Sequence, residues 1–219
     1  MKTLVSAAIA AGLLMAAAPA GAAINGGFEA AGATTSTTFV GSNVYAYGVA
    51  PGWNAYNNSY ATTTVGEVST AANHDPFAAA GFKMFKITSS ETNDGLYQLP
   101  GGFGFLSADF FVLSGHAQLV AASSRGDYLS TVATTANNTW QHLTLNTTAG
   151  AGEIALYTSG AGSFYVDNVV TGAFQTGAPA SSVTTWSGGV PEPASWALMI
   201  IGFASAGAML RHRRAALAG

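Results

Sequence analysis

Aromatic rings and carboxamides gather in one short stretch of this sequence. The rings belong to Tyr45, Tyr47, Trp53, Tyr56 and Tyr60, and Asn54, Asn57 and Asn58 stand among them. A flat ring can pack on the C–H face of a sugar while neighbouring amides bond its hydroxyl groups, because ligand sites combine apolar walls with a few polar groups. The stretch predicts carbohydrate binding, with Trp53, Tyr56 and Tyr60 as candidate contacts. In the alternative, Trp53 fills the hydrophobic core and the tyrosines lie on strands or loops without a ligand.

Signatures of catalysis are scarce in comparison. The chain has no cysteine, no Gly-x-Ser-x-Gly, no His-Glu-x-x-His and no phosphate-binding glycine loop. Asp109 and Asp127 could form a glycosidase pair of carboxyl groups, but acids are scattered along the chain and many such pairs can be drawn. We therefore predict a protein that is not an enzyme, with a hydrolase as the least favoured alternative.

Charge limits the partners of the region between residues 24 and 190. This region holds three basic and nine acidic residues, a net charge of −6. Nucleic acid is an improbable partner, because neutralising phosphates requires clustered Lys and Arg. An acidic surface is instead compatible with calcium.

Short aromatic or β-branched runs alternate with Gly- and Asn-rich breaks, which predicts an all-β fold. Ile154 and Leu156 point one way, and Glu153, Ala155 and Tyr157 point the other. About ten short strands in one domain favour a β-sandwich or jelly roll, over residues 24–174. Residues 175–189, rich in Ser, Thr, Gly and Ala, are expected to form a flexible spacer. Strands are expected near Ile24–Ala30, Thr38–Tyr47, Thr63–Val68, Phe82–Thr88, Gly95–Leu99, Gly104–Leu113, Ala117–Ala122, Tyr128–Thr134, Trp140–Asn146, Glu153–Thr158 and Ser163–Phe174.

Both ends of the sequence look like targeting segments. Met1-Lys2, an apolar run over 4–17 and small residues at 20–23 predict a secretory signal peptide over residues 1–23, removed by signal peptidase after entry into the export machinery. Ala194–Leu210 carries no charge over 17 residues, a length at the short edge of a membrane-spanning helix. The arginines within residues 211–214 would hold that end in the cytoplasm, and Trp196 suits an interfacial anchor.

The tail resembles the PEP-CTERM sorting signal of Gram-negative bacteria, in its Pro-Glu-Pro-x-x-Trp-Ala form. Over residues 190–214 the matching residues are Val190, Pro191, Glu192, Pro193, Trp196, Ala197, Leu198, Met199, Gly202, Phe203, Ala204, Gly207, Arg211, Arg213 and Arg214. The resemblance implies recognition by an exosortase, a precursor anchored in the inner membrane, and association with exopolysaccharide or biofilm in the envelope or extracellular matrix. The alternative is an ordinary C-terminal membrane anchor.

The region between the signals resembles the galactose-binding-like jelly rolls, in particular secreted carbohydrate-binding modules. The resemblance rests on Asn25-Gly26-Gly27-Phe28-Glu29, on Pro51-Gly52-Trp53 and on Asp167-Asn168-Val169. It implies a structural Ca²⁺ site in which Glu29 and Asp167 join backbone carbonyl groups. The function expected is non-catalytic polysaccharide binding at the cell surface. A purely structural surface protein that binds no sugar is the alternative.

Overall fold

A computed structural model describes residues 22–41, 43–58, 62–69 and 82–186 of the chain. The predicted signal peptide lies almost wholly outside these residues, as do Tyr60 and the sorting signal with its predicted membrane helix. Within the described ranges, no helix is long and apolar enough to cross a membrane.

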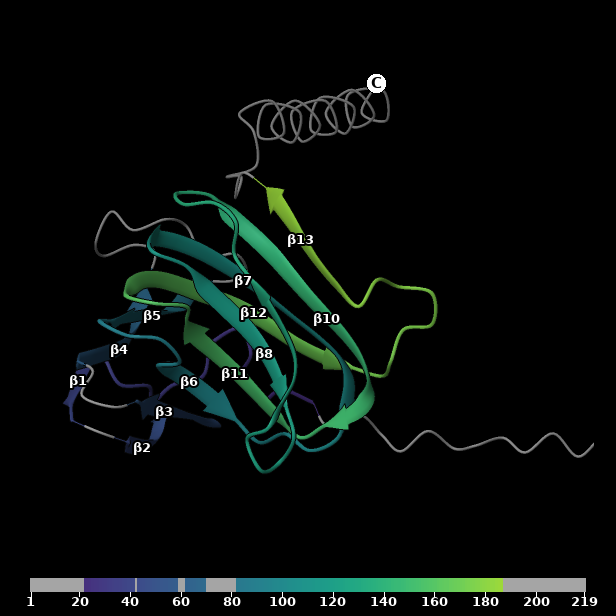
Figure 1. Cartoon of the computed structure of the whole chain (residues 1–219). Coiled ribbons are helices and arrows are strands. Elements are labelled where there is room, and N and C mark those ends of the chain that lie inside the picture. The colour runs from purple at the N-terminus through teal and green to yellow at the C-terminus, as the bar shows by residue number, and fades with distance from the viewer. Residues whose placement is uncertain (1–21, 42, 59–61, 70–81, 187–219) are drawn as a thin grey trace, which may run out of the picture.

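The described chain folds into two antiparallel sheets that face each other (Figure 1). One sheet has the strand order β1-β4-β5-β12-β7-β10-β13 and the other β2-β3-β6-β11-β8-β9. The strands are β1 (Thr37–Val40), β2 (Val44–Ala50), β3 (Trp53–Asn57), β4 (Thr62–Ser69), β5 (Lys83–Ser89), β6 (Gly95–Gln98), β7 (Phe103–Ser114), β8 (Ala117–Ala122), β9 (Tyr128–Ala133), β10 (Trp140–Ala151), β11 (Glu153–Thr158), β12 (Gly162–Gly172) and β13 (Ser181–Trp186).

Eight of these strands have jelly-roll connectivity. The four-strand orders β5-β12-β7-β10 and β6-β11-β8-β9 face each other, and every connection from β5 to β12 changes sheet except that between β8 and β9. This pattern of paired crossings is that of two Greek keys closed into a sandwich. The predicted all-β jelly-roll sandwich is confirmed. β1 and β4 extend one edge of the first sheet, and the β2–β3 hairpin extends the second.

Alternation along the strands builds the core between the sheets. On β11, Ile154 and Leu156 lie in the core, whereas Glu153, Ala155 and Tyr157 face outward, as their alternation predicts. The inward positions of both sheets form one continuous apolar cluster. Its largest members include Phe28, Trp53, Phe85, Ile87, Leu96, Leu106, Phe110, Leu119, Leu143 and Phe164.

The segment expected to be the first strand, Ile24–Ala30, is a turn instead. Asn25 and Phe28 take positive φ values of 51° and 54°, and the Phe28 N–H donates to the Asn25 carbonyl oxygen at 3.1 Å. Left-handed backbone interrupts an extended ladder. The turn still reaches β12, because the Val169 N–H donates to the Gly26 carbonyl oxygen at 2.9 Å. A β-carbon on Gly26 would lie 2.0 Å from the Val169 carbonyl oxygen, so only glycine permits this approach.

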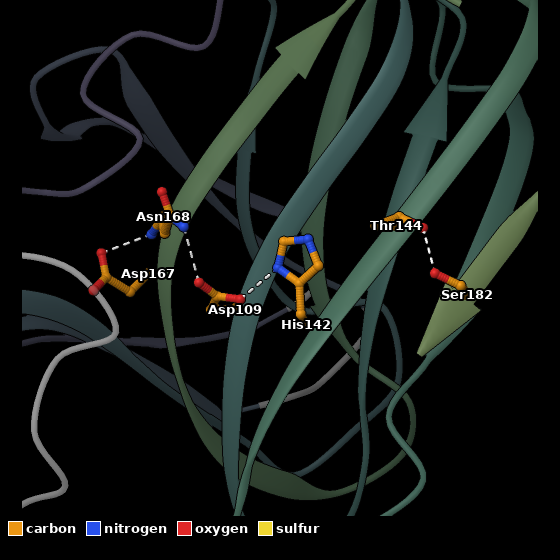
Figure 2. A network of polar contacts seen from close by, with 6 residues as sticks. All are labelled: Asp109, His142, Thr144, Asp167, Asn168 and Ser182. Carbon is orange, nitrogen blue, oxygen red and sulfur yellow. Dashed lines mark hydrogen bonds and ion pairs between the residues drawn. The ribbon is translucent and has the colours of Figure 1, made fainter. Parts of the chain in front are cut away.

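The expected flexible spacer contains a strand. β13 pairs with β10 over six residues, from Trp140 opposite Trp186 to Leu145 opposite Ser181, and runs beside β10 at the edge of the sheet (Figure 1). The hydroxyl groups of Thr144 and Ser182 lie 2.7 Å apart (Figure 2). Composition alone indicated a linker here. The unpaired edge of β10 offered hydrogen bonds that a β-branched segment could take up.

Candidate functional site

The outer face of the six-stranded sheet carries a cleft of about 500 Å³. Its aromatic walls come from neighbouring strands: Tyr45 on β2, Tyr56 on β3, Tyr97 on β6, Tyr157 on β11 and Tyr128 on β9. Each of these strands turns its alternate residues into the core, so the tyrosines are left on the opposite face. The remaining residues that line the cleft are Asn58, Asn93, Leu99, Ser124, Arg125, Gly126 and Glu153.

The tyrosine rings are in contact with one another. The Tyr45 ring centroid lies 4.9 Å from that of Tyr56 and 6.4 Å from that of Tyr97, and the Tyr56 and Tyr157 centroids are 6.2 Å apart. Tyr45 and Tyr128 are about half exposed, whereas Tyr157 is buried. Tyr157 therefore packs at the base, with Val120, Ala122 and Ala155, and the other rings are open to solvent.

Burial raises the pKa values of several polar groups in the cleft. Burial raises the pKa of the Glu153 carboxyl group above its usual value. Burial, followed by the negative charge of Glu153, raises the pKa of Tyr128 to about 12. For Tyr97, burial and then the neighbouring Tyr47 and Glu153 raise the pKa to about 12. At neutral pH these phenols are therefore protonated hydrogen-bond donors.

Trp53 fills the hydrophobic core, as the alternative to sugar contact predicted. Its side chain is fully buried, its ring centroid lies 5.5 Å from that of Phe28, and its indole N–H donates to the Asn25 carbonyl oxygen at 3.1 Å. A ring with no exposed face cannot stack on a ligand. Tyr56 lies in the cleft, and Tyr60 lies outside the described residues.

Sequence reasoning missed most of the cleft. Tyr97, Tyr128, Tyr157 and Glu153 are far from the aromatic stretch at residues 45–60, and only the order of strands in the sheet brings them to it. The alternation of β11 did place Glu153 and Tyr157 on one outward face. That was the available signal, and it gave no indication of which strands would lie beside β11.

A chain of polar contacts crosses the outer face of the seven-stranded sheet (Figure 2). His142 Nδ1 lies 2.6 Å from Asp109 Oδ1, and the Asn168 side-chain amide donates to Asp109 Oδ2 at 3.0 Å. The Asn168 backbone N–H donates to Asp167 Oδ1 at 2.7 Å. The hydrogen bond to Asp109 raises the pKa of His142 against the opposing effect of burial.

The suggested glycosidase pair has no support from this arrangement. Asp109 is buried on β7, with His142 and Asn168 as partners. Asp127 lies in the turn between β8 and β9, where its carboxylate accepts a hydrogen bond from the Ser123 hydroxyl at 3.3 Å. One carboxyl group lies on a strand of the seven-stranded sheet and the other in a turn of the six-stranded sheet, and they belong to different hydrogen-bond networks.

Glu29 and Asp167, the predicted calcium ligands, both have side chains close to Gly27. A β-carbon on Gly27 would lie 3.9 Å from Asp167 Oδ1 and 3.9 Å from the Glu29 γ-carbon. Asp167 is fully buried, and Glu29 is exposed and accepts the N–H groups of Phe82 and Lys83 at 2.6 and 2.8 Å. In the described ranges, no three His, Cys, Asp or Glu side chains gather as metal ligands, so calcium would depend on carbonyl oxygens for its remaining ligands.

Solved structures similar to this chain are distant. An arabinose-bound α-L-arabinofuranosidase has 14% identity and a TM-score of 0.44, over 70% of this chain and 26% of that one. A family 11 carbohydrate-binding module from Clostridium thermocellum, in complex with a mixed-linked tetrasaccharide, has 13% identity and a TM-score of 0.40, over 66% of this chain and 99% of that one. The enzymatically active domain of tailspike protein 4 from bacteriophage CBA120 has 16% identity and a TM-score of 0.35, over 68% and 21%.

The sequence comparisons concern the tail. No curated protein matches the chain. This chain spans about a quarter of the arabinofuranosidase that it resembles in structure. Residues 189–214, which include the Pro191-Glu192-Pro193 triplet, match the PEP-CTERM protein-sorting motif, and the chain therefore carries this sorting signal.

Proposed function

We propose that this chain is an exported, exosortase-sorted protein of the cell envelope or extracellular matrix, and that its sandwich binds a polysaccharide without cleaving it. The observation that supports sugar binding is the cleft of five tyrosines on the six-stranded sheet. The sorting motif supports export and processing by an exosortase. The association with exopolysaccharide or biofilm belongs to the same proposal.

The chemistry of the cleft suits a sugar chain. The exposed rings of Tyr45 and Tyr128 and the partly buried ring of Tyr56 offer apolar faces for pyranose C–H groups. The phenol hydroxyl groups, the Asn58 and Asn93 amides and the Glu153 carboxylate supply donors and acceptors for sugar hydroxyl groups. An open cleft on a sheet can also admit a chain longer than one sugar, as a matrix polymer requires.

The lining of the cleft favours binding over hydrolysis. Glycoside hydrolysis ordinarily requires two carboxyl groups, about 5 Å or about 6.5–9.5 Å apart. Among the described residues that line the cleft, Glu153 supplies the one carboxyl group. Asp94, the acid nearest to Asn58, is buried and accepts hydrogen bonds from the Asn58 N–H and the Ser89 hydroxyl.

A glycan array probed with the purified full chain tests the proposal. Tyr56→Ala and Tyr45→Ala should each lower the affinity for the bound glycan about fivefold, since stacking of one ring contributes on the order of 1 kcal/mol. Phe82→Ala is the matched control, because Phe82 is an exposed ring directly before β5, a strand of the other sheet. Absence of binding to any matrix polysaccharide would favour the structural alternative, in which the sandwich provides bulk or spacing. Release of shorter products would favour a hydrolase.

A further inference from the structure

The tyrosine cleft contains a carboxylate that has no cationic partner among the described residues. Glu153 begins β11 and is about half-buried among tyrosine rings. No Lys, Arg or His nitrogen lies within 4 Å of its oxygens in the part of the chain that the structure describes. The negative charge of Glu153 also contributes to the raised pKa values of Tyr97, Tyr128 and Tyr157. The field at this point of the cleft is therefore negative, and nothing described in the protein neutralises it at close range.

Aromatic rings around a carboxylate favour a cation. The face of a tyrosine ring attracts an ammonium group within about 6 Å of its centroid, and the attraction grows when the group is desolvated. A nearby carboxylate adds a charge-assisted hydrogen bond to the same group. Tyr97, Tyr128 and Tyr157 place several ring systems around Glu153. This combination suits an ammonium group carried on a sugar ring, whose carbon face can stack while its amine pairs with the carboxylate.

We propose that the cleft selects a cationic amino sugar, such as the glucosamine units of a de-N-acetylated hexosamine polymer, with Glu153 as the residue that recognises the ammonium group. This inference rests on the proposed function of the cleft as a polysaccharide site. It adds the charge class of the ligand and the residue that determines it.

Arg125 is the positively charged residue in the lining of the cleft, and it would repel the ammonium group of an amino sugar. It lies in the exposed turn between β8 and β9, where the Ser123 hydroxyl oxygen accepts the N–H groups of Arg125 and Asp127, both at 3.2 Å. Asp127 on the same turn carries the opposite charge. Exposed charges are strongly screened by salt, whereas the half-buried Glu153 is screened less. The electrostatic potential beside Glu153 therefore stays negative.

The test is calorimetric titration of the purified full chain in a neutral detergent. The probes are β-1,4-linked hexasaccharides of glucosamine, N-acetylglucosamine and glucose, at about pH 6.5, where carboxylates are largely ionised and amines largely protonated. We expect the glucosamine hexamer to bind about tenfold tighter than the other two, as one ammonium–ring contact with its carboxylate can supply. Added salt should reduce that preference.

Two variants test whether Glu153 causes the preference for the glucosamine hexamer. Glu153→Gln keeps the shape and should equalise the three affinities, and Arg125→Gln should preserve or increase the preference for glucosamine. A melting curve for each variant checks the fold. Equal or tighter binding of the glucose hexamer by the unmodified protein overturns the inference and leaves sugar binding standing. A preference that survives Glu153→Gln also overturns it. If the protein binds none of the three hexamers and no glycan on the array, the proposed function itself is overturned.

Discussion

The ion pair between His142 and Asp109 makes folding stability depend on pH. The folded pKa of His142 is raised above its ordinary value of 6.5 by the hydrogen bond to Asp109. A raised folded pKa stabilises the native state fully below the unfolded pKa, and this stabilisation is lost as the pH rises through the folded pKa. The Tm difference between the unmodified chain and His142→Gln should therefore be larger at about pH 5.5 than at about pH 8.

Thermal melts over that pH range measure the effect. His116→Gln is the control, because the His116 ring contacts the Thr134 carbonyl oxygen (3.2 Å) and not a carboxylate. If His142→Gln and the unmodified chain keep the same Tm difference at both pH values, the pair does not govern the pH dependence.

Trp53 is a second residue whose role can be measured. Because the side chain is fully buried against Phe28, Trp53→Ala should lower the free energy of unfolding by about 3–5 kcal/mol. For a domain of this size each kcal/mol lowers Tm by roughly 2–4 °C. Tyr47→Ala removes a ring that is 76% exposed and should change Tm little. A Trp53→Ala variant that binds glycan poorly but melts normally would return Trp53 to the binding site.

At the scale of elements, we predict that residues 181–186 stabilise the sheet as the strand β13 and do not serve only as a spacer. Replacing Ser181–Trp186 with a Gly-Ser repeat of equal length should lower Tm and expose the edge of β10, because Gly and Ser pair poorly in sheets and a bare edge promotes association. A Thr-Val repeat of equal length retains β propensity and is the matched control. Calorimetry and size-exclusion chromatography measure both effects. Equal Tm values for the two replacements would mean that the segment contributes only length.

Calcium remains a prediction that links the first turn to β12. Ca²⁺ that binds only the native state would stabilise it by about 2.7 kcal/mol at a hundredfold excess over its Kd. Chelation should then lower Tm by several degrees, and Glu29→Gln or Asp167→Asn should abolish that response. Glu91→Gln, on an exposed carboxylate before β6, is the control. Identical melting curves with calcium and with chelator would remove the site.

At the scale of the whole molecule, the sorting motif predicts two separable steps. Replacing Pro191-Glu192-Pro193 with alanines should block processing by the exosortase while export continues, because the signal peptide is unchanged. Mass spectrometry of the cell-associated protein measures processing. Protease added to intact spheroplasts measures export, and it should digest the sandwich in both forms. An unchanged mature mass in the alanine variant would contradict exosortase recognition.

The sequence alone determined what depends on neighbours along the chain. Alternation of side chains, as in Ile154 and Leu156 against Glu153 and Tyr157, fixes which residues of a strand share a face, and it predicted the all-β sandwich. The sorting signal is likewise a linear pattern, read from Pro191 to Arg214 without reference to the fold.

Tertiary structure decided what depends on distant segments. Close backbone approach at Gly26 and positive φ at Asn25 and Phe28 turn the expected first strand into a turn, and pairing with β10 turns the expected spacer into β13. The cleft joins tyrosines from five strands, and Asp109 meets His142 because β7 and β10 are neighbours in register. Strand order and register arise from long-range pairing and packing, which local residue patterns do not specify.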